Sequence, residues 1–348
     1  MELTETKNDA GRNMDAITYC VCTVSINLKY LFIIANREKL AKNINDAIAD
    51  WLSAKNNEKS YKIMKKYAST SRLCTFIMVY LCYIVGSLYI LTVVVINVKE
   101  IFFEDRMNIT DGINTRNRMF IIPCGELGNK MTELQYAIFT IVNTVQLLVI
   151  CTTQSITDCF FINVTLHISG QLKVLKTKFK SFTSKPDTHI NYRKQFINLV
   201  NRHCKLMEHN QNVEDTFHLC ILFQFVSVTL LLALLGLRIL LFFKNGDYIE
   251  SIKTILFLNY MFIESLLFCY GGDFVQKGSE GIFRAMYMTS WVTFPVTLMK
   301  DLKFAIMRSS YPFRLTGGKF FYVNCQTMVY ILKTAASYIS VLRVALKD

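Results

Sequence analysis

Long apolar segments recur along this chain and constrain its fold more than any other feature. Each of six stretches is long enough to cross the roughly 30 Å hydrocarbon core of a bilayer as a helix. With 52% hydrophobic residues among 348 and a mean hydropathy of +0.29, the composition is typical of a polytopic membrane protein rather than a soluble enzyme. We therefore predict an all-α membrane helix bundle. The six spans are residues 17–35, 73–98, 136–159, 217–243, 254–270 and 320–342.

A further apolar stretch, residues 286–307, does not meet the requirements of a span. It is interrupted by Pro295 and by Lys300, Asp301 and Lys303. A proline breaks the interior of a helix, and three charges are costly in lipid. We predict a helix that lies at or below the membrane surface.

The net charge of +13 is concentrated in three of the segments between spans. Residues 36–72 and 167–216 each carry nine Lys or Arg against four acids, and residues 271–319 carry seven against three. The alternating segments, residues 99–135 and 244–253, have no positive excess. Because basic segments remain in the cytoplasm, both termini are predicted to lie outside. In the basic segments lysines alternate with apolar residues, which indicates amphipathic helices continuing below the membrane and not a nucleic-acid site.

One sequon agrees with this orientation. Asn108-Ile109-Thr110 falls in the long segment assigned to the outside, where a glycosyltransferase can reach it. Asn108 is therefore a predicted glycosylation site.

The motifs of soluble catalysis are absent from the sequence. No P-loop, GxGxxG, HExxH or GxSxG is present, and no Cys and His cluster has metal-ligand spacing. All five histidines lie in or beside residues 167–216 and are predicted to be solvated. We expect a protein that is not an enzyme, with no cofactor, no metal site and no catalytic residues.

Five ionisable residues lie inside the predicted spans and each costs free energy in hydrocarbon. Lys29, Glu264 and Lys333 are deep, so we expect interior pairing or contact with cytoplasmic water. Asp158 and Arg238 lie near the ends of their spans, where snorkelling to the interface is the simpler explanation.

The last two spans and the segment between them carry a specific order of motifs. CYGGDFVQKGSEGIFRAMYMTSW, residues 269–291, combines Cys-Tyr-x-Gly-acid with a Tyr-x-x-x-Trp end, and residues 306–312 read IMRSSYP. The final helix ends in Ser-Tyr-x-x-x-Leu-Arg at residues 337–343. This order resembles the C-terminal signature of insect odorant receptors. Weaker similarity, including Asp-x-x-Phe and His-x-x-x-Gln within residues 157–175, extends the resemblance over nearly the whole chain.

Members of that family have seven spans, a cytoplasmic N-terminus and an external C-terminus, whereas six spans are visible here. The resemblance therefore implies that this chain lacks the family's first helix, through either a real start or an incomplete gene prediction. It also implies an odorant-gated, non-selective cation channel in the plasma membrane of an olfactory neuron dendrite. The expected partners are the shared olfactory coreceptor, in a heterotetramer, a small volatile odorant and membrane lipid, with no nucleic acid.

The resemblance also divides the chain by role. Residues 1–270 would form the ligand-binding transmembrane bundle with cytosolic helical extensions. Residues 271–319 would form cytosolic helices that anchor the subunits, and residues 320–348 the pore-lining helix and external tail.

In the final helix, small and hydroxylated residues recur three or four positions apart on one face. The resemblance implies that this face lines a pore, with Val341 at its narrowest point. Close packing between helices explains the same small residues without a pore. The predicted pore and gate residues are Thr334, Ser337, Val341 and Ala345.

By the same resemblance, the odorant site lies in the outer half of the first, second, third and fifth visible spans. A small volatile needs aromatic and hydroxyl groups more than charges. Ordinary bundle packing has the same helical spacing, so core positions remain an alternative for each residue. The predicted ligand-binding residues are Tyr19, Thr23, Tyr83, Ser87, Ile90, Tyr136, Phe139, Asn143 and Tyr260.

Two alternatives stay open within the same class of protein. A gustatory receptor-type ligand-gated channel would share the fold, with a different terminal signature. A nonfunctional truncated receptor would retain the signature without activity. A G-protein-coupled receptor or a secondary transporter is less compatible, because their characteristic motifs and matched helix breaks are absent.

Overall fold

The computed structural model describes residues 10–107, 132–182, 189–245, 248–289, 291 and 294–345. These residues form eight helices and one two-stranded antiparallel sheet, so the expected all-α bundle is confirmed. The predicted glycosylation site, Asn108, lies outside the described residues. The elements are α1 (Ala10–Ala35), α2 (Arg37–Ala54), α3 (Glu58–Met107), α4 (Glu133–Phe182), α5 (His189–Asn245), α6 (Tyr248–Tyr287), α7 (Val296–Ser309), β1 (Thr316–Gly317), β2 (Phe321–Tyr322) and α8 (Cys325–Ala345).

Three of the helices are much longer than a bilayer is thick. α3 and α4 have 50 residues each and α5 has 57, which corresponds to about 75 and 85 Å at 1.5 Å per residue. The basic segments that alternate with the spans are therefore largely helical continuations, as the amphipathic pattern predicts. α7 is a separate helix of 14 residues, in agreement with the prediction that residues 286–307 do not form a span.

By length and composition, five described helices can cross a membrane, namely α1, α3, α4, α5 and α6. α8, which contains residues 325–342 of the sixth predicted span, is not among them. The first residues of that predicted span, 320–324, lie in the hairpin and the turn before α8.

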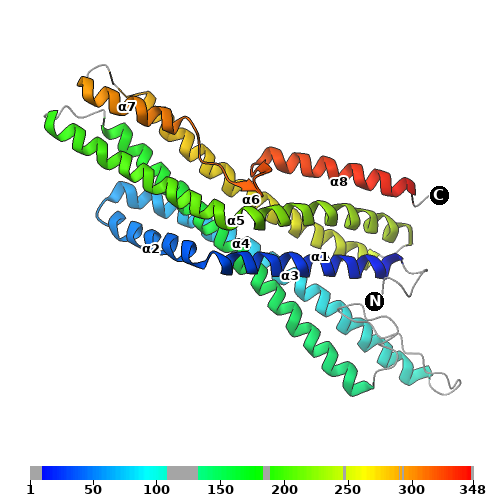
Figure 1. Ribbon diagram of the computed structural model, residues 1–348. Coiled ribbons are helices and arrows are strands. Elements are labelled where there is room, and N and C mark those ends of the chain that lie inside the picture. The colour runs from blue at the N-terminus through cyan, green and yellow to red at the C-terminus, as the bar shows by residue number, and fades with distance from the viewer. Residues whose placement is uncertain are drawn as a thin grey trace.

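The helices diverge toward one end of the bundle. α1 begins and α8 ends at that end, whereas α2 and α7 lie toward the other (Figure 1). α8 runs alongside the second half of α5, and the outer parts of α3 and α4 lean away from α1 together (Figure 1). Since α1 and α8 have their terminal ends on the same side, the arrangement agrees with the prediction that both termini share one side of the membrane.

The core is centred on α4, which contacts α1, α3, α5 and α6. Phe161 of α4 stacks on Phe268 of α6 with ring centroids 4.6 Å apart and meets Phe217 of α5 edge to face at 5.2 Å. All three side chains are almost fully buried. Aromatic pairs in these geometries contribute roughly 0.5–1.5 kcal/mol each beyond area burial, so they join the three helices at one level.

Two aspartates of α2 attach that helix to the second half of α4 and the first half of α5. Asp50 lies 2.6 Å from Arg202 Nη2 and 3.2 Å from His167 Nε2, and Asp46 lies 2.6 Å from His209 Nε2. Burial alone would raise the pKa of Asp50, but the hydrogen bonds from His167 and Arg202 outweigh it and lower the pKa below 3.8. The prediction that the histidines are solvated is therefore wrong for His167 and His209, and it is also wrong for His203, which is buried and stacks on Phe313.

A short hairpin fixes the start of α8 against α5. Thr316 pairs with Tyr322, and the turn between the strands uses positive φ angles of 60° at Gly318 and 65° at Lys319. The backbone N–H of Gly318 donates to the carbonyl oxygen of His218 at 2.7 Å, and that of Thr316 donates to Glu214 at 2.8 Å. α8 therefore leaves the hairpin in a direction set by α5.

Gly272 of α6 permits a close approach of this hairpin segment. A Cβ at position 272 would overlap the backbone carbonyl oxygen of Val323, which has no rotamer with which to move aside. We expect Gly272→Ala to destabilise the protein by about 1–3 kcal/mol, as overpacking does elsewhere. The melting temperature of the detergent-purified protein, followed by fluorescence-detected size exclusion, measures this loss.

Gly278→Ala is the matched control on the same helix. There the added Cβ would meet only the side chain of Leu172, at 3.1 Å, and that side chain can shift. A Gly272→Ala protein that melts no lower than Gly278→Ala would contradict the assigned packing.

Candidate functional site: an apolar cavity between two charged clusters

A cavity of about 220 Å³ lies between α1, α3, α4, α5 and α6. Most of its wall is apolar, so small uncharged molecules suit its interior. Its length runs along α5 and α6, from Gln224 to Arg238 on one helix and from Met261 to Glu250 on the other. Representative apolar lining residues are Ile26, Val85, Tyr89, Ile150, Leu231 and Phe257.

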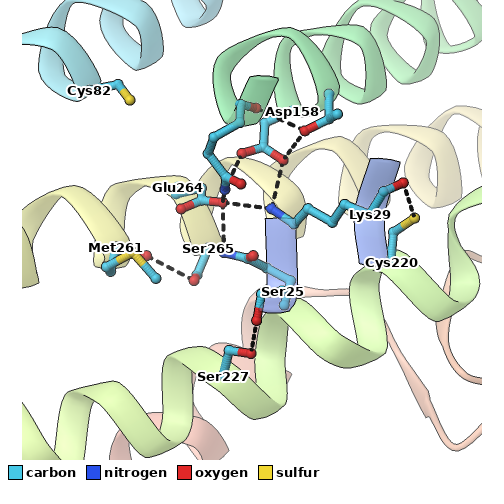
Figure 2. Close-up of polar contacts among 12 residues, drawn as sticks. Ser25, Lys29, Cys82, Asp158, Cys220, Ser227, Met261, Glu264 and Ser265 are labelled. Atoms are coloured by element: carbon cyan, nitrogen blue, oxygen red, sulfur yellow. Dashed lines mark hydrogen bonds and ion pairs between the residues drawn. The ribbon is translucent and has the colours of Figure 1, made fainter. Parts of the chain in front are cut away.

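A buried ion cluster closes the inner end of the cavity. Lys29 of α1 places its Nζ 2.9 Å from Oδ1 of Asp158 on α4 and 3.1 Å from Oε1 of Glu264 on α6 (Figure 2). The side chains are 2%, 1% and 0% exposed, respectively. The Lys29 ammonium also lies 5.5 Å from the centre of the Phe268 ring. The three charges therefore lie inside the bundle and connect three helices.

Two glutamine amides separate this cluster from the cavity. Gln154 Nε2 donates to Asp158 Oδ2 at 2.7 Å and also to Glu264, and Gln224 Nε2 donates to Glu264 Oε1 at 2.6 Å. Both glutamines line the cavity. Further hydrogen bonds offset part of the cost of burying an ion pair, and the two amides supply three of them, whereas Glu264 Oε2 has no partner among the described residues.

A second charged cluster lies at the outer end of the cavity. Glu250 accepts from Lys253 at 2.6 Å and from Arg238 at 3.5 Å. Arg238 also lies 4.9 Å from the ring centre of Phe242, and Lys253 lies 5.1 Å from that of Tyr89. Since Arg238, Glu250 and Lys253 all line the cavity, its outer end is polar and rich in hydrogen-bond donors.

These contacts decide the predictions for charged residues inside the spans. The interior pairing expected of Lys29 and Glu264 is confirmed. Snorkelling is wrong for Asp158, because α4 continues well beyond it and places its carboxylate in the core. It is also wrong for Arg238, whose side chain is buried against Glu250. Lys333 lies exposed on α8.

The comparison with known proteins gives the family. A family model described as 7tm odorant receptor matches residues 9–336, nearly the whole chain. The chain belongs to the odorant receptor family. This is not an enzyme family, and together with the apolar helices it indicates a multi-pass membrane protein.

Individual relatives are distant. Odorant receptor 10a and Odorant receptor 22c of Drosophila melanogaster are each 23% identical to this chain, over 194 and 201 residues. The matches cover 53% and 54% of this chain and 47% and 48% of the relatives, so the chain spans about half the length of the curated relatives it matches.

Solved structures show the fold. The insect olfactory receptor OR5 from Machilis hrabei in complex with eugenol superposes with a TM-score of 0.80 at 17% identity, over 99% of this chain and 84% of that receptor. A second structure of OR5 from Machilis hrabei superposes with a TM-score of 0.78, over 98% of this chain and 82% of that receptor. The odorant receptor bundle predicted from the C-terminal motifs is therefore the fold of this chain.

The structure distributes the predicted odorant-contacting residues of this receptor over several environments. Tyr19, Thr23 and Tyr260 line the cavity. Asn143 is buried away from the cavity lining, and Tyr136, Phe139 and Ile90 are half-buried outside it. Tyr83 and Ser87 are exposed, with the Tyr83 hydroxyl 2.7 Å from Thr152 Oγ1.

On α3 the helical period was predicted correctly but its phase was not. Cys82, Val85, Gly86 and Tyr89 line the cavity, one position away from the predicted face. Hydroxyl groups guided the prediction, whereas the lining of α3 is mainly small, apolar or thiol-bearing. Sequence reasoning also missed Gln154 and Gln224, for which the signal was an uncharged amide inside an apolar span.

Three of the four predicted pore residues have described side chains, and all three lie on the part of α8 that faces away from the bundle. Met328, Ile331 and Ala335 are buried toward the bundle, whereas Thr334, Ser337 and Val341 are exposed on other faces of the helix. Val341 is 63% exposed. Ala345 is the last residue of α8. In the single chain this face is available to water or to another subunit, and its assignment to a pore stays a prediction.

Removal of Lys29 should destabilise this receptor strongly. Lys29→Met would leave Asp158 and Glu264 buried without a cation, and breaking such a pair typically costs about 3–5 kcal/mol. Lys39→Met is the matched control, because Lys39 pairs with Asp215 at 2.7 Å on the exposed surface, where a pair contributes about 0–1 kcal/mol. The melting temperatures of the purified variants test the difference.

A rescue variant separates charge from packing. In Lys29→Met/Asp158→Asn/Glu264→Gln no net charge remains buried, so we expect part of the lost melting temperature to return. If Lys29→Met has the same melting temperature as Lys39→Met, the cluster does not hold the three helices together.

Proposed function

We propose that this chain is an odorant receptor subunit that opens a non-selective cation channel when a small volatile molecule occupies the cavity between α1, α3, α4, α5 and α6. The observation that carries the proposal is an apolar cavity of about 220 Å³ inside an odorant receptor fold. The solved relative OR5 was obtained in complex with eugenol, a small volatile phenol. A cavity of this kind can exclude water from an apolar ligand and hold it by shape.

The position of α5 offers a route from the cavity to the candidate pore. Gln224, Ser227 and Leu231 of α5 line the cavity. Further along the same helix α8 packs so closely that a Cβ at Gly236 would come within 3.1 Å of Ile339 Cγ1. A ligand that fits one position of α5 better than another would favour the matching position of α8 through this contact. The ligand can change the equilibrium between the two states only by the difference in its affinity for them.

The expected assembly and domain roles belong to the same proposal. A heterotetramer with the shared coreceptor in the plasma membrane of olfactory dendrites would place the α8 helices around one pore. Residues 1–270 would bind the ligand, residues 271–319 would join the subunits and residues 320–348 would line the pore. Residues 271–319 expose large apolar side chains, including Trp291, Phe304 and Tyr311, which support a subunit contact there.

Current recordings test the channel directly. In oocytes that express this chain with the coreceptor, we expect volatile-evoked cation currents that neither chain alone produces at the same size. Ile150→Trp, which fills the cavity wall with a larger ring, should reduce these currents by about tenfold or more. Currents that persist in Ile150→Trp would place the ligand elsewhere.

Val341 tests the proposed gate. If apolar side chains close the pore by excluding water, Val341→Ser should raise the current in the absence of a volatile ligand severalfold. Val329→Ser is the matched control, since Val329 is an exposed valine on a different face of α8. Equal resting currents in the two variants would remove Val341 from the gate.

A further inference from the structure

The two glutamine amides at the inner end of the cavity have a fixed orientation. In the structure both amides present their nitrogen to the carboxyl oxygens of Asp158 and Glu264, which accept the hydrogen bonds. Gln154 Nε2 donates to both carboxylates and Gln224 Nε2 donates to Glu264. The carbonyl oxygens of both amides are therefore turned away from the cluster, on side chains that line the cavity.

These carbonyl oxygens accept no hydrogen bond from the described residues. Gln154 Oε1 is buried without a donor, and the contacts of Gln224 consist of its donation to Glu264. Gln154 and Gln224 are 7% and 2% exposed. An unpaired buried acceptor is unfavourable, so any molecule that enters this end gains free energy by donating to it.

Most of the neighbouring donor hydrogens are already used, and one hydrogen of the Ser25–Ser227 pair remains. Lys29 donates to Asp158 and Glu264, the hydroxyls of Ser25 and Ser227 share a hydrogen bond, and the Cys82 thiol donates to the carbonyl oxygen of Cys151 at 3.6 Å. Figure 2 shows the serine pair and Cys82 around the cluster. The inner end therefore offers acceptors, whereas a ligand that itself only accepts would find few partners there.

The charges at the two ends of the cavity strengthen this polarity. The inner cluster has one base, Lys29, against two acids, and the outer cluster has two bases, Arg238 and Lys253, against one acid. The inner end thus has a negative excess and the outer end a positive excess. In a low-dielectric interior this field orients a dipolar ligand with its positive hydrogen toward the glutamines.

We infer that this cavity selects volatiles that carry a hydroxyl group, namely alcohols and phenols, and binds them with the hydroxyl at the Gln154–Gln224 end. The inference rests on the proposed function, because only that function makes the bound molecule an odorant that opens the channel. The binding test itself does not require a channel. A water molecule at the same place would leave the selection intact, because a ligand that displaces it without donating a hydrogen bond loses affinity.

Matched ligand pairs test the selection on the purified full chain. The pairs are 1-hexanol with 2-hexanone, and 4-methylphenol with 4-methylanisole, titrated against the melting temperature. One hydrogen bond to a buried acceptor predicts that each hydroxyl compound binds about tenfold more tightly than its partner. Gln224→Met, which keeps the side-chain length without the amide, should reduce this ratio, and the double variant Gln154→Met/Gln224→Met should bring it to about one.

Leu231→Val is the matched control for the cavity wall on the same helix. It should weaken both members of a pair together and keep their ratio. Should Gln224→Met fail to fold, the ratio measured on the unaltered protein decides the question.

The remaining outcomes are distinct. Equal binding within each pair overturns the inference. A preference for the ketone that disappears in Tyr260→Phe also overturns it, because the Tyr260 hydroxyl on the same wall would then be the selecting group as a donor. Selective binding of hydroxyl compounds without an evoked current would support the inference and overturn the proposed channel. Failure of all four compounds to bind would overturn both.

Discussion

The buried contact of Lys29 with Asp158 and Glu264 is the interaction on which the rest of the structure depends. It joins α1, α4 and α6 through three charged side chains that are almost fully buried. An isolated charge at that depth is prohibitively costly, so each of the three residues restricts the rotation and register of its helix. Apolar packing between long helices is permissive, since one smooth face can slide over another. The cluster removes that freedom, and the stacked rings of Phe161 and Phe268 then pack at the same level.

The same cluster explains why the cavity ends where it does. Two carboxylates against one ammonium need additional donors, and Gln154 and Gln224 provide them from α4 and α5. The two glutamine side chains also line one end of a space whose wall is otherwise mostly apolar. A stabilising network and a ligand-facing surface are therefore made from the same side chains. α5 carries both Gln224 and the close contact of Gly236 with Ile339 on α8, so the cavity wall and the packing of α8 share one helix.

Much of this architecture could be predicted from the sequence, and the failures have physical causes. Hydropathy located five of the six predicted spans in helices that can cross a membrane, and the charge balance located the basic helical continuations, because both effects act on whole segments. The face of α3 that lines the cavity could not be predicted, since the sequence does not show whether Cys82 or Tyr83 faces the neighbouring helices. Asp158 was misjudged because its depth depends on how far α4 continues past it. His167 and His209 were misjudged because their partners, Asp50 and Asp46, lie more than a hundred residues earlier in the chain.

The two charged clusters also balance one another across the cavity. A negative excess at Lys29, Asp158 and Glu264 would be costly alone in a medium of low dielectric constant. The positive excess at Arg238, Glu250 and Lys253 lies at the other end of the same cavity, about 16 Å away along α6 if counted from Lys253 to Glu264 at 1.5 Å per residue. At that distance the attraction offsets only part of the burial cost, so amides and aromatic rings near each cluster remain necessary. The apolar wall between them keeps the field unscreened, which allows one hydroxyl group on a small ligand to matter.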